Sequence, residues 1–172
     1  IQLDTHQHVA TVTLNRPEQG NSIDLASAKE MMDVAIACSE DDNIRSVVLT
    51  GAGKAFCVGG DIKTFAADAD EIGAAIKHIT SYFHQAISHW VNMQKPFIGA
   101  INGVAAGGGM SLALGCDLLY AAQNSKFVMA YNQLGFSPDG AGSYFLPRLV
   151  GVRRALELLY TNRALSADEA LD

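Results

Sequence analysis

Apolar residues recur at every third or fourth position between residues 70 and 92, which is the spacing of one face of an α-helix. The positions that carry this stripe are Ile72, Ile76, Ile79, Phe83, Ile87 and Trp90. A second helix is predicted from Asp24, whose side chain is suited to cap a helix N-terminus, to about Ser39. Its expected apolar face consists of Leu25, Ala28, Met32, Ala35 and Ile36.

Short apolar runs rich in β-branched residues alternate with helical segments and predict strands. The predicted strands cover residues 9–14, 46–50, 97–101, 118–121 and 126–129. Further helices are predicted at 107–114 and 152–160, and another opens after the turn Pro138-Asp139-Gly140 and is interrupted near Pro147. Ser166 and Glu169 have the pattern of a capping box for one more helix. Strands that alternate with helices indicate an α/β layered fold.

The composition is that of a folded protein, because 49% of the residues are apolar and 17% are charged. A length of 172 residues suits one domain or slightly more. The net charge of -6, without a basic run, argues against nucleic acid as a partner. Three cysteines without paired spacing favour a reducing compartment and argue against disulfides and a zinc site. The longest apolar stretch is too short to span a membrane. We therefore expect a cytoplasmic protein, although a start at Ile1 is compatible with a targeting peptide removed upstream.

Two glycine-rich segments, residues 56–61 and 102–109, each follow an apolar run of strand character. Glycine has no Cβ, so its backbone N–H can face a ligand that a side chain would keep away. Two such N–H groups that converge on one point form an oxyanion hole, which stabilises the negative charge of an activated acyl group. The alternative for each segment is a glycine that lets a helix and a strand pack closely.

These two segments and three further motifs resemble the crotonase (enoyl-CoA hydratase/isomerase) superfamily over essentially the whole chain. The further motifs are Lys95-Pro96, Cys116-Asp117 and Leu146-Pro147-Arg148-Leu149-Val150-Gly151. The resemblance implies an α/β crotonase-like spiral of ββα units, with residues 1–172 as the core domain. It also implies acyl-CoA thioester substrates, no cofactor beyond the CoA of the substrate, no metal, and homotrimers or dimers of trimers. The C-terminal helical segment that the family carries is missing from this chain.

By the same resemblance, the N–H groups of Gly60 and Gly108 hold the thioester oxygen. The residues implied at the adenine end of CoA are Gln19, Gly20, Gly60, Asp61 and Ile62, and Val58 of the same loop is assigned to substrate binding. Lys63 follows this loop and is either a contact of the CoA phosphates or a solvated lysine.

Carboxylates distinguish the reactions of this superfamily. Its hydratases use two glutamates, and the positions that match them here hold Ser111 and Tyr131. Neither side chain is a good base at neutral pH, which disfavours a hydratase mechanism. The isomerases place a carboxylate in the turn that here contains Asp139, and a single carboxylate is enough to shift a double bond. We therefore expect an acyl-CoA isomerase with Asp139 as acid and base, whereas without the resemblance Asp139 would be a helix cap.

Other functions stay open at this stage. Hydrolytic aryl-CoA dehalogenases of this superfamily carry an aspartate that matches Asp139 and a histidine that matches His84, but a tryptophan where Tyr131 stands. His84 is either a packing residue or a wall and proton-relay partner of the acyl pocket. Tyr131 and Ser111 are assigned to substrate binding, Tyr131 as a wall or a hydrogen-bond donor. A hydratase with substituted residues and a non-catalytic acyl-CoA-binding protein are the remaining alternatives.

Overall fold

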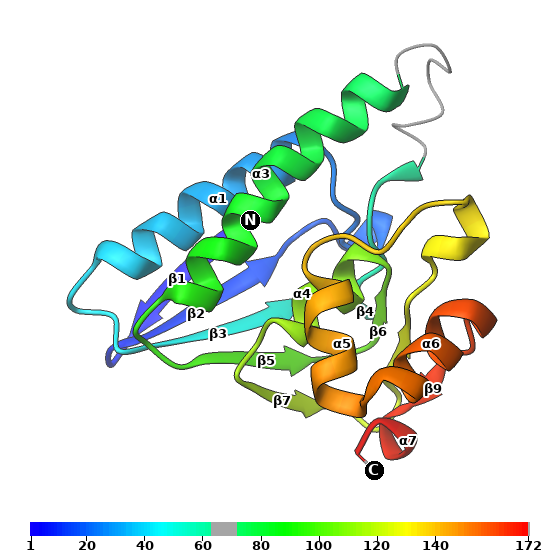
Figure 1. The fold of residues 1–172 in the computed structure, drawn as a ribbon. Coiled ribbons are helices and arrows are strands. Elements are labelled where there is room, and N and C mark those ends of the chain that lie inside the picture. The colour runs from blue at the N-terminus through cyan, green and yellow to red at the C-terminus, as the bar shows by residue number, and fades with distance from the viewer. Residues whose placement is uncertain (63–71, 172) are drawn as a thin grey trace.

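In the computed structural model, which describes residues 1–62 and 72–171, the chain winds as a spiral of strand–strand–helix units (Figure 1). One unit consists of β3 (Ser46–Gly51), β4 (Ala55–Cys57) and α3 (Ile72–Asn92). The next consists of β5 (Phe97–Ile101), β6 (Val104–Ala106) and α4 (Gly108–Leu114). The first strand of each unit joins one sheet and the second strand joins another. The expected spiral of ββα units is thereby confirmed.

The strands of the described residues form two sheets. The first has the order β1-β2-β3-β5-β7, where β1 (Gln2–His6) is antiparallel to β2 (Val9–Leu14) and the other neighbours, up to β7 (Leu118–Ala121), are parallel. In the second, β4, β6 and β8 (Lys126–Val128) are parallel, and β9 (Leu165–Ser166) is antiparallel to β8. Because β4 and β6 are parallel neighbours, the loops that follow them leave the sheet at the same edge.

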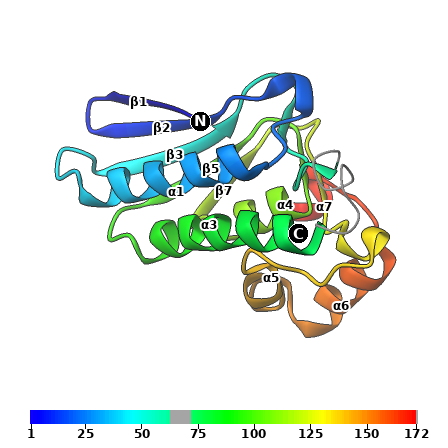
Figure 2. The ribbon, with the colours of Figure 1, turned by 90° about the horizontal axis from the view of Figure 1, so that it is seen from above.

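The helices lie around these sheets. α1 (Leu25–Glu40) and α3 run side by side, as both views show (Figures 1 and 2). Every residue of α4 is buried, whereas α5 (Gly142–Val150), α6 (Val152–Thr161) and α7 (Ala167–Leu171) lie further out. Short 3-10 helices η1 (Pro17–Gln19) and η2 (Tyr131–Leu134) occupy two loops. In the part of the chain that the structure describes, none of the helices is long and apolar enough to cross a membrane.

Both helix caps that the sequence predicts are confirmed. The Asp24 carboxylate accepts a hydrogen bond from the Ser27 backbone N–H at 2.8 Å, and Ser27 Oγ accepts one from the Asp24 N–H at 2.9 Å. At α7, the Ser166 N–H donates to Glu169 Oε2 at 2.9 Å, and the Glu169 N–H donates to Ser166 Oγ at 3.2 Å. Each cap satisfies N–H groups that have no partner within the helix.

The buried face of α1 differs from the predicted one. Ala28 and Ala35 are buried as expected, but Leu25 is 46% exposed, and Met31 and Cys38 complete the buried stripe. The face of α1 that is buried is thus rotated about the helix axis from the face that the apolar residues predict. Its partners explain this turn, because α1 packs against both the core and α3, and the small side chains of its alanines allow the closest approach.

The predicted interruption near Pro147 is wrong, because α5 runs through this residue without a break. Proline has no N–H and removes one hydrogen bond, here to the carbonyl of Ser143. Ser143 is exposed, so water can bind that carbonyl. The cost of the proline is therefore smaller than in a buried helix.

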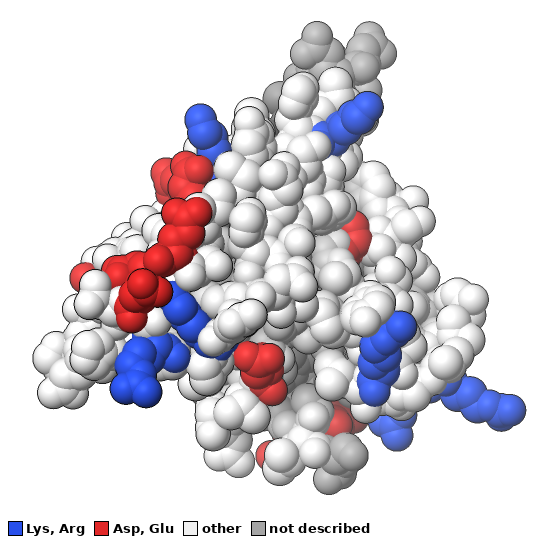
Figure 3. Space-filling model, turned by 60° about the vertical axis from the view of Figure 1, so that its left-hand side comes forward, with Lys and Arg blue, Asp and Glu red and all other residues white. Residues whose placement is uncertain are grey.

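Charged side chains are unevenly spread over the surface. On the face drawn in Figure 3, many acidic residues gather in a band on the left, whereas lysine and arginine side chains lie in small groups that do not join across the face. This face offers no continuous basic strip of the kind that follows a nucleic acid backbone.

The revised face of α1 can be tested by comparing Met31→Ala with Leu25→Ala. We expect Met31→Ala to lower the free energy of unfolding by about 2–4 kcal/mol, since Met31 is 1% exposed and leaves a cavity. Leu25→Ala should cost less than about 1 kcal/mol. Urea denaturation measures both, and equal losses would contradict the observed face.

Candidate functional site

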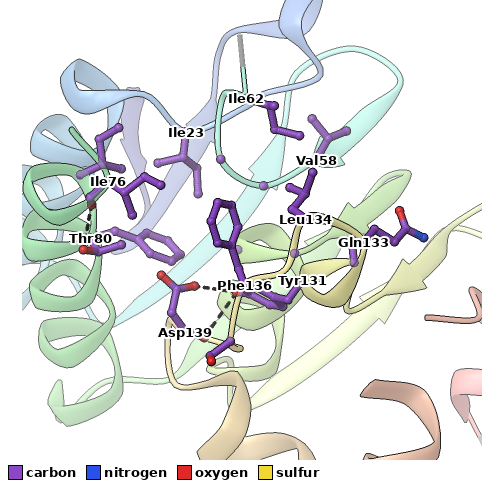
Figure 4. Close-up of a pocket in the computed structure, with 18 of the residues that line it drawn as sticks. Ile23, Val58, Ile62, Ile76, Thr80, Tyr131, Gln133, Leu134, Phe136 and Asp139 are labelled. Carbon is purple, nitrogen blue, oxygen red and sulfur yellow. Dashed lines mark hydrogen bonds between the residues drawn. The ribbon is translucent and has the colours of Figure 1, made fainter. Parts of the chain in front are cut away.

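A cavity of about 460 Å³ lies between α3, the loop after β4, the start of α4 and η2 (Figure 4). Most of the described wall is apolar: Ile23, Val58, Ile62, Ile76, Ile79, Phe83, Leu134 and Phe136. The described polar side chains in the wall are Thr80, His84, Tyr131, Gln133, Ser137 and Asp139. Since polar neighbours are few, an electrostatic contact formed inside the cavity is stronger than the same contact in water.

The loop after β4 brings Gly60 to the wall of this cavity. Ile23 donates its N–H to the Gly59 carbonyl at 2.8 Å and accepts from the Asp61 N–H at 2.9 Å. In extended backbone, successive N–H groups point to opposite sides, so the N–H of Gly60 points away from the backbone of Ile23. Gly60 itself lines the cavity. Its N–H is therefore available to a ligand there.

The second glycine N–H comes from the start of α4. Gly108 is the first residue of this helix, and the N–H of a first residue has no acceptor within the helix. Gly108 also lines the cavity, with Phe83 and Ile23 next to the place where a Cβ would stand. The preceding Gly107 has φ +51°, which favours glycine, and donates its own N–H to the Val128 carbonyl at 3.0 Å.

The two loops are in contact, because Gly59 leaves room for it. A Cβ on Gly59 would lie 2.9 Å from the Ala106 carbonyl oxygen and 3.2 Å from the Gly108 nitrogen. Gly109 has a different role: a Cβ there would lie 2.1 Å from the Cys57 carbonyl oxygen, so it serves close packing of α4 on β4. Close packing, one of the two explanations offered for the glycine segments, thus applies to Gly59 and Gly109.

Asp139 faces the cavity from the segment before α5. The helix itself is capped at Ala141 without a side-chain hydrogen bond, so Asp139 is not its cap. Instead, Tyr131 Oη lies 2.7 Å from Asp139 Oδ1, as the dashed line in Figure 4 shows. Tyr131 Oη is also 2.8 Å from Ser111 Oγ. The carboxylate is therefore held at one oxygen by a buried hydroxyl chain.

Tyr131 stays a hydrogen-bond donor. Burial of its side chain and then the negative charge of Asp139 raise the pKa of Tyr131 far above its usual value. Its hydroxyl therefore keeps its proton at neutral pH and cannot serve as a base there.

His84 contacts the other oxygen of the carboxylate. Its Nε2 lies 3.1 Å from Asp139 Oδ2, and the Gly140 N–H points to the same nitrogen at 3.3 Å. A ring nitrogen either carries a hydrogen and donates or is bare and accepts, so the two contacts belong to different tautomers. With hydrogen on Nε2, His84 donates to ionised Asp139. With Nε2 bare, it accepts instead from the Gly140 N–H.

The residues expected at the adenine end of CoA, with Val58 of the same loop, are brought together only in part. Val58 and Ile62 stand at the cavity, 41% and 51% exposed, and Gly20 packs against Val58, whose N–H donates to the Gly20 carbonyl at 3.1 Å. Asp61 forms an ion pair with Arg16 at 3.1 Å and accepts from Ser22 Oγ at 3.2 Å.

Four of the expected site residues lie outside the wall that the described residues form: Gln19, Gly20, Asp61 and Ser111. Ser111 is fully buried and contacts Tyr131 instead of the cavity. Lys63 lies outside the described residues.

Two residues at the site had no place in the sequence-based hypothesis. Arg16 joins Asp61 to Asp24, both at 3.1 Å, and so ties the loop after β4 to the start of α1. Phe136 places its ring in the cavity beside Asp139 (Figure 4). An arginine in a turn and a phenylalanine in a loop carry no local signal of this kind. Among the described residues, no three His, Cys, Asp or Glu side chains come together as a metal site would require.

Comparison with known proteins finds relatives with several activities. The family described as Enoyl-CoA hydratase/isomerase matches residues 4–172. The 1,2-epoxyphenylacetyl-CoA isomerase of Escherichia coli (strain K12) is 39% identical over 94% of this chain and 62% of that protein. The 4-chlorobenzoyl coenzyme A dehalogenase-2 of an Arthrobacter sp is 35% identical over 100% of this chain and 63% of that protein. The crystal structure of enoyl-CoA hydratase from Bacillus anthracis has a TM-score of 0.91 and 38% identity, covering 98% of this chain and 65% of that one. The chain thus spans less than two thirds of each of these relatives.

The contact between the two loops can be tested with Gly59→Ala. Because Gly59 has φ +93° and a Cβ there meets backbone, we expect a loss of stability larger than the roughly 1–3 kcal/mol of strain that an unfavourable φ costs by itself. Gly151→Ala is the control, since Gly151 has φ +78° but no described atom within 4 Å of its Cβ position. Urea denaturation measures both, and similar losses would mean that the loops are not in close contact.

The raised pKa of Tyr131 predicts a pH dependence of stability. Above about pH 10 the unfolded chain loses the tyrosine proton while the folded protein keeps it, so the free energy of unfolding falls by up to about 1.4 kcal/mol per pH unit. Tyr131→Phe should remove this part of the slope. Denaturation of both proteins between pH 9 and 11 measures it, and identical slopes would show that Tyr131 ionises normally.

Proposed function

The chain belongs to the enoyl-CoA hydratase/isomerase family and has the crotonase fold, and on this premise we propose that it shifts a double bond in an enoyl-CoA thioester. Gly60 and Gly108 hold the thioester oxygen through their N–H groups, and Asp139 carries the proton. The relative from Escherichia coli is by its name an isomerase of an acyl-CoA, although its substrate is an epoxide and not an enoyl-CoA.

The observation that carries the proposal is the single carboxylate in an apolar wall. Among the described residues that line the cavity, Asp139 is the one Asp or Glu. Addition of water needs a base for the water and an acid for the α-carbon, and Tyr131 cannot share this work because it keeps its proton. A double-bond shift needs only one group that takes up a proton and returns it. The site therefore fits isomerisation better than hydration.

The proposed reaction runs in two proton transfers. Asp139 removes a proton from the acyl chain, and the electrons of that C–H bond move into the thioester to form a dienolate. The two glycine N–H groups stabilise the negative oxygen, in a cavity where few other dipoles compete. Asp139 then returns the proton to a carbon two positions away, which restores the thioester carbonyl with the double bond shifted. The hydrogen bonds of Tyr131 and His84 keep the carboxylate in place through both steps.

The CoA part of the substrate is proposed to pass the loop after β4, along Gln19, Gly20, Val58, Asp61 and Ile62. No cofactor is needed beyond this CoA, because the proton and the electrons stay within the substrate and Asp139. We further propose residues 1–172 as a core domain, a homotrimer or dimer of trimers, and a cytoplasmic location. Apolar side chains exposed on β7 support contact with further copies: Leu118, Leu119 and Tyr120.

The second candidate is a hydrolytic dehalogenase, because His84 contacts Asp139 and the dehalogenase from Arthrobacter is similar over the whole chain. In that reaction Asp139 would attack an aromatic carbon and release halide, and water would then hydrolyse the aspartyl ester. Halide release from 4-chlorobenzoyl-CoA distinguishes this reaction from isomerisation.

Replacement of Asp139 tests the proposal. In deuterated water, NMR of a 3-enoyl-CoA incubated with the protein should show the 3-ene disappear and the conjugated 2-ene appear. Asp139→Asn should slow this conversion by about 10³-fold, the contribution of a positioned acid and base, while binding of the thioester stays nearly unchanged. Asp33→Asn, on the exposed side of α1, is the control for loss of a carboxylate. An Asp139→Asn variant that kept more than a tenth of the activity would contradict the mechanism.

A further inference from the structure

We propose that Ser111 and Tyr131 form a hydrogen-bonded strut that fixes the orientation of the Asp139 carboxylate. Neither residue is a base in the proposed reaction, and Ser111 does not line the cavity. They are positioning residues: Ser111 acts on Tyr131, and Tyr131 acts on Asp139. The kinetic consequence rests on the proposed function, whereas the geometry of the strut does not.

Chemistry fixes the direction of the hydrogen bonds. An ionised carboxylate only accepts, so Tyr131 Oη donates its single hydrogen to Asp139 Oδ1 over 2.7 Å. The contact of 2.8 Å between Tyr131 Oη and Ser111 Oγ must then be donated by the serine. The strut is thus a chain of two donations that ends on the carboxylate. Donation to a charged acceptor is the stronger kind of hydrogen bond, and a second donation behind it strengthens it further.

Packing keeps the strut in one position. Ser111 is 0% exposed and Tyr131 8%, so water does not compete for their hydroxyls. The turn that carries Asp139 rests directly on Ser111, because a Cβ on Gly140 would lie 3.1 Å from Ser111 Cβ and one on Gly142 would lie 2.5 Å from Ser111 Oγ. Both glycines are needed for this approach. The serine on α4 therefore fixes the turn as well as the tyrosine.

The other contact of the carboxylate differs in kind. The His84 side chain is 48% exposed, and its Nε2 has a choice between Asp139 and the Gly140 N–H. Water reaches this outer partner and its ring nitrogen has two possible contacts, whereas the two hydroxyls of the strut are buried. Orientation of the carboxylate is therefore assigned to Ser111 and Tyr131.

A double-mutant cycle tests the strut. Tyr131→Phe removes only the hydroxyl, and we expect kcat for the double-bond shift to fall by about 10- to 100-fold, the effect of losing a hydrogen bond to a charged group. Ser111→Ala should lower kcat by about 3- to 10-fold, because it acts through the tyrosine. Added to Tyr131→Phe, it should have no further effect. KM should stay within about threefold throughout, since neither hydroxyl is expected to hold the CoA.

The controls remove the same groups elsewhere. Ser125 is a matched residue, 1% exposed, whose Oγ donates to the Ile101 carbonyl at 2.8 Å. Ser125→Ala should lower stability like Ser111→Ala but leave kcat unchanged. Tyr160→Phe, at a tyrosine 74% exposed on α6, should change neither.

Three kinetic results would each overturn the strut. These are a kcat of Tyr131→Phe within twofold of the wild type, losses of the two single variants that multiply in the double variant, and a loss that falls on KM instead of kcat. Failure of the wild type to convert any enoyl-CoA would contradict the proposed function and not the strut. Crystal structures of the wild type and of Tyr131→Phe then decide: a turned or split Asp139 carboxylate in the variant supports the strut, and an unchanged one overturns it.

Discussion

The site depends on the close contact of two backbone segments that leave no space for a Cβ between them. The loop after β4 meets the start of α4 at Gly59, where a Cβ would come within 2.9 Å of backbone. The parallel pairing of β4 with β6 brings the two segments to one edge of the second sheet, and Arg16 ties the first of them to α1. Main-chain donors held in this way need little rearrangement when charge develops on a ligand.

The rest of the cavity complements these donors. Asp139 reaches it from a different part of the chain and is held between an exposed histidine and a buried hydroxyl chain. Ile76, Phe83 and Phe136 keep the surroundings apolar, which strengthens the hydrogen bonds to the carboxylate. Relatives named as isomerase, dehalogenase and hydratase have similar identity to this chain, so the fold they have in common does not by itself distinguish these reactions.

Local patterns predicted much of the fold. β5 and β7 have the predicted bounds, and α3 and α6 follow their apolar stripes, because these elements bury one face or lie inside the sheet. β1 was missed since all its residues are exposed, and β4 and β6 are three residues long, too short for a periodic signal. The buried face of α1 depends on its packing partners, which the sequence of the helix does not contain.

The site was predicted as a set of residues but not as a geometry. The positions of Gly60, Gly108 and Asp139 came from the family resemblance, and the sites themselves remain proposals. The hydrogen-bond chain from Ser111 to Tyr131 joins residues that are 20 positions apart, on α4 and η2, so it arises only from tertiary packing. The same holds for the contact of His84 with Asp139, over 55 positions.

The central claim is that the N–H groups of Gly60 and Gly108 polarise a thioester carbonyl in this cavity. Infrared difference spectroscopy tests it directly, with a saturated acyl-CoA that carries ¹³C at the thioester carbonyl and cannot react. The account predicts that the stretching frequency of the labelled C=O is lower in the bound thioester than in the thioester in water, because two fixed donors weaken the double bond. A bound thioester whose carbonyl frequency equals that in water would contradict it.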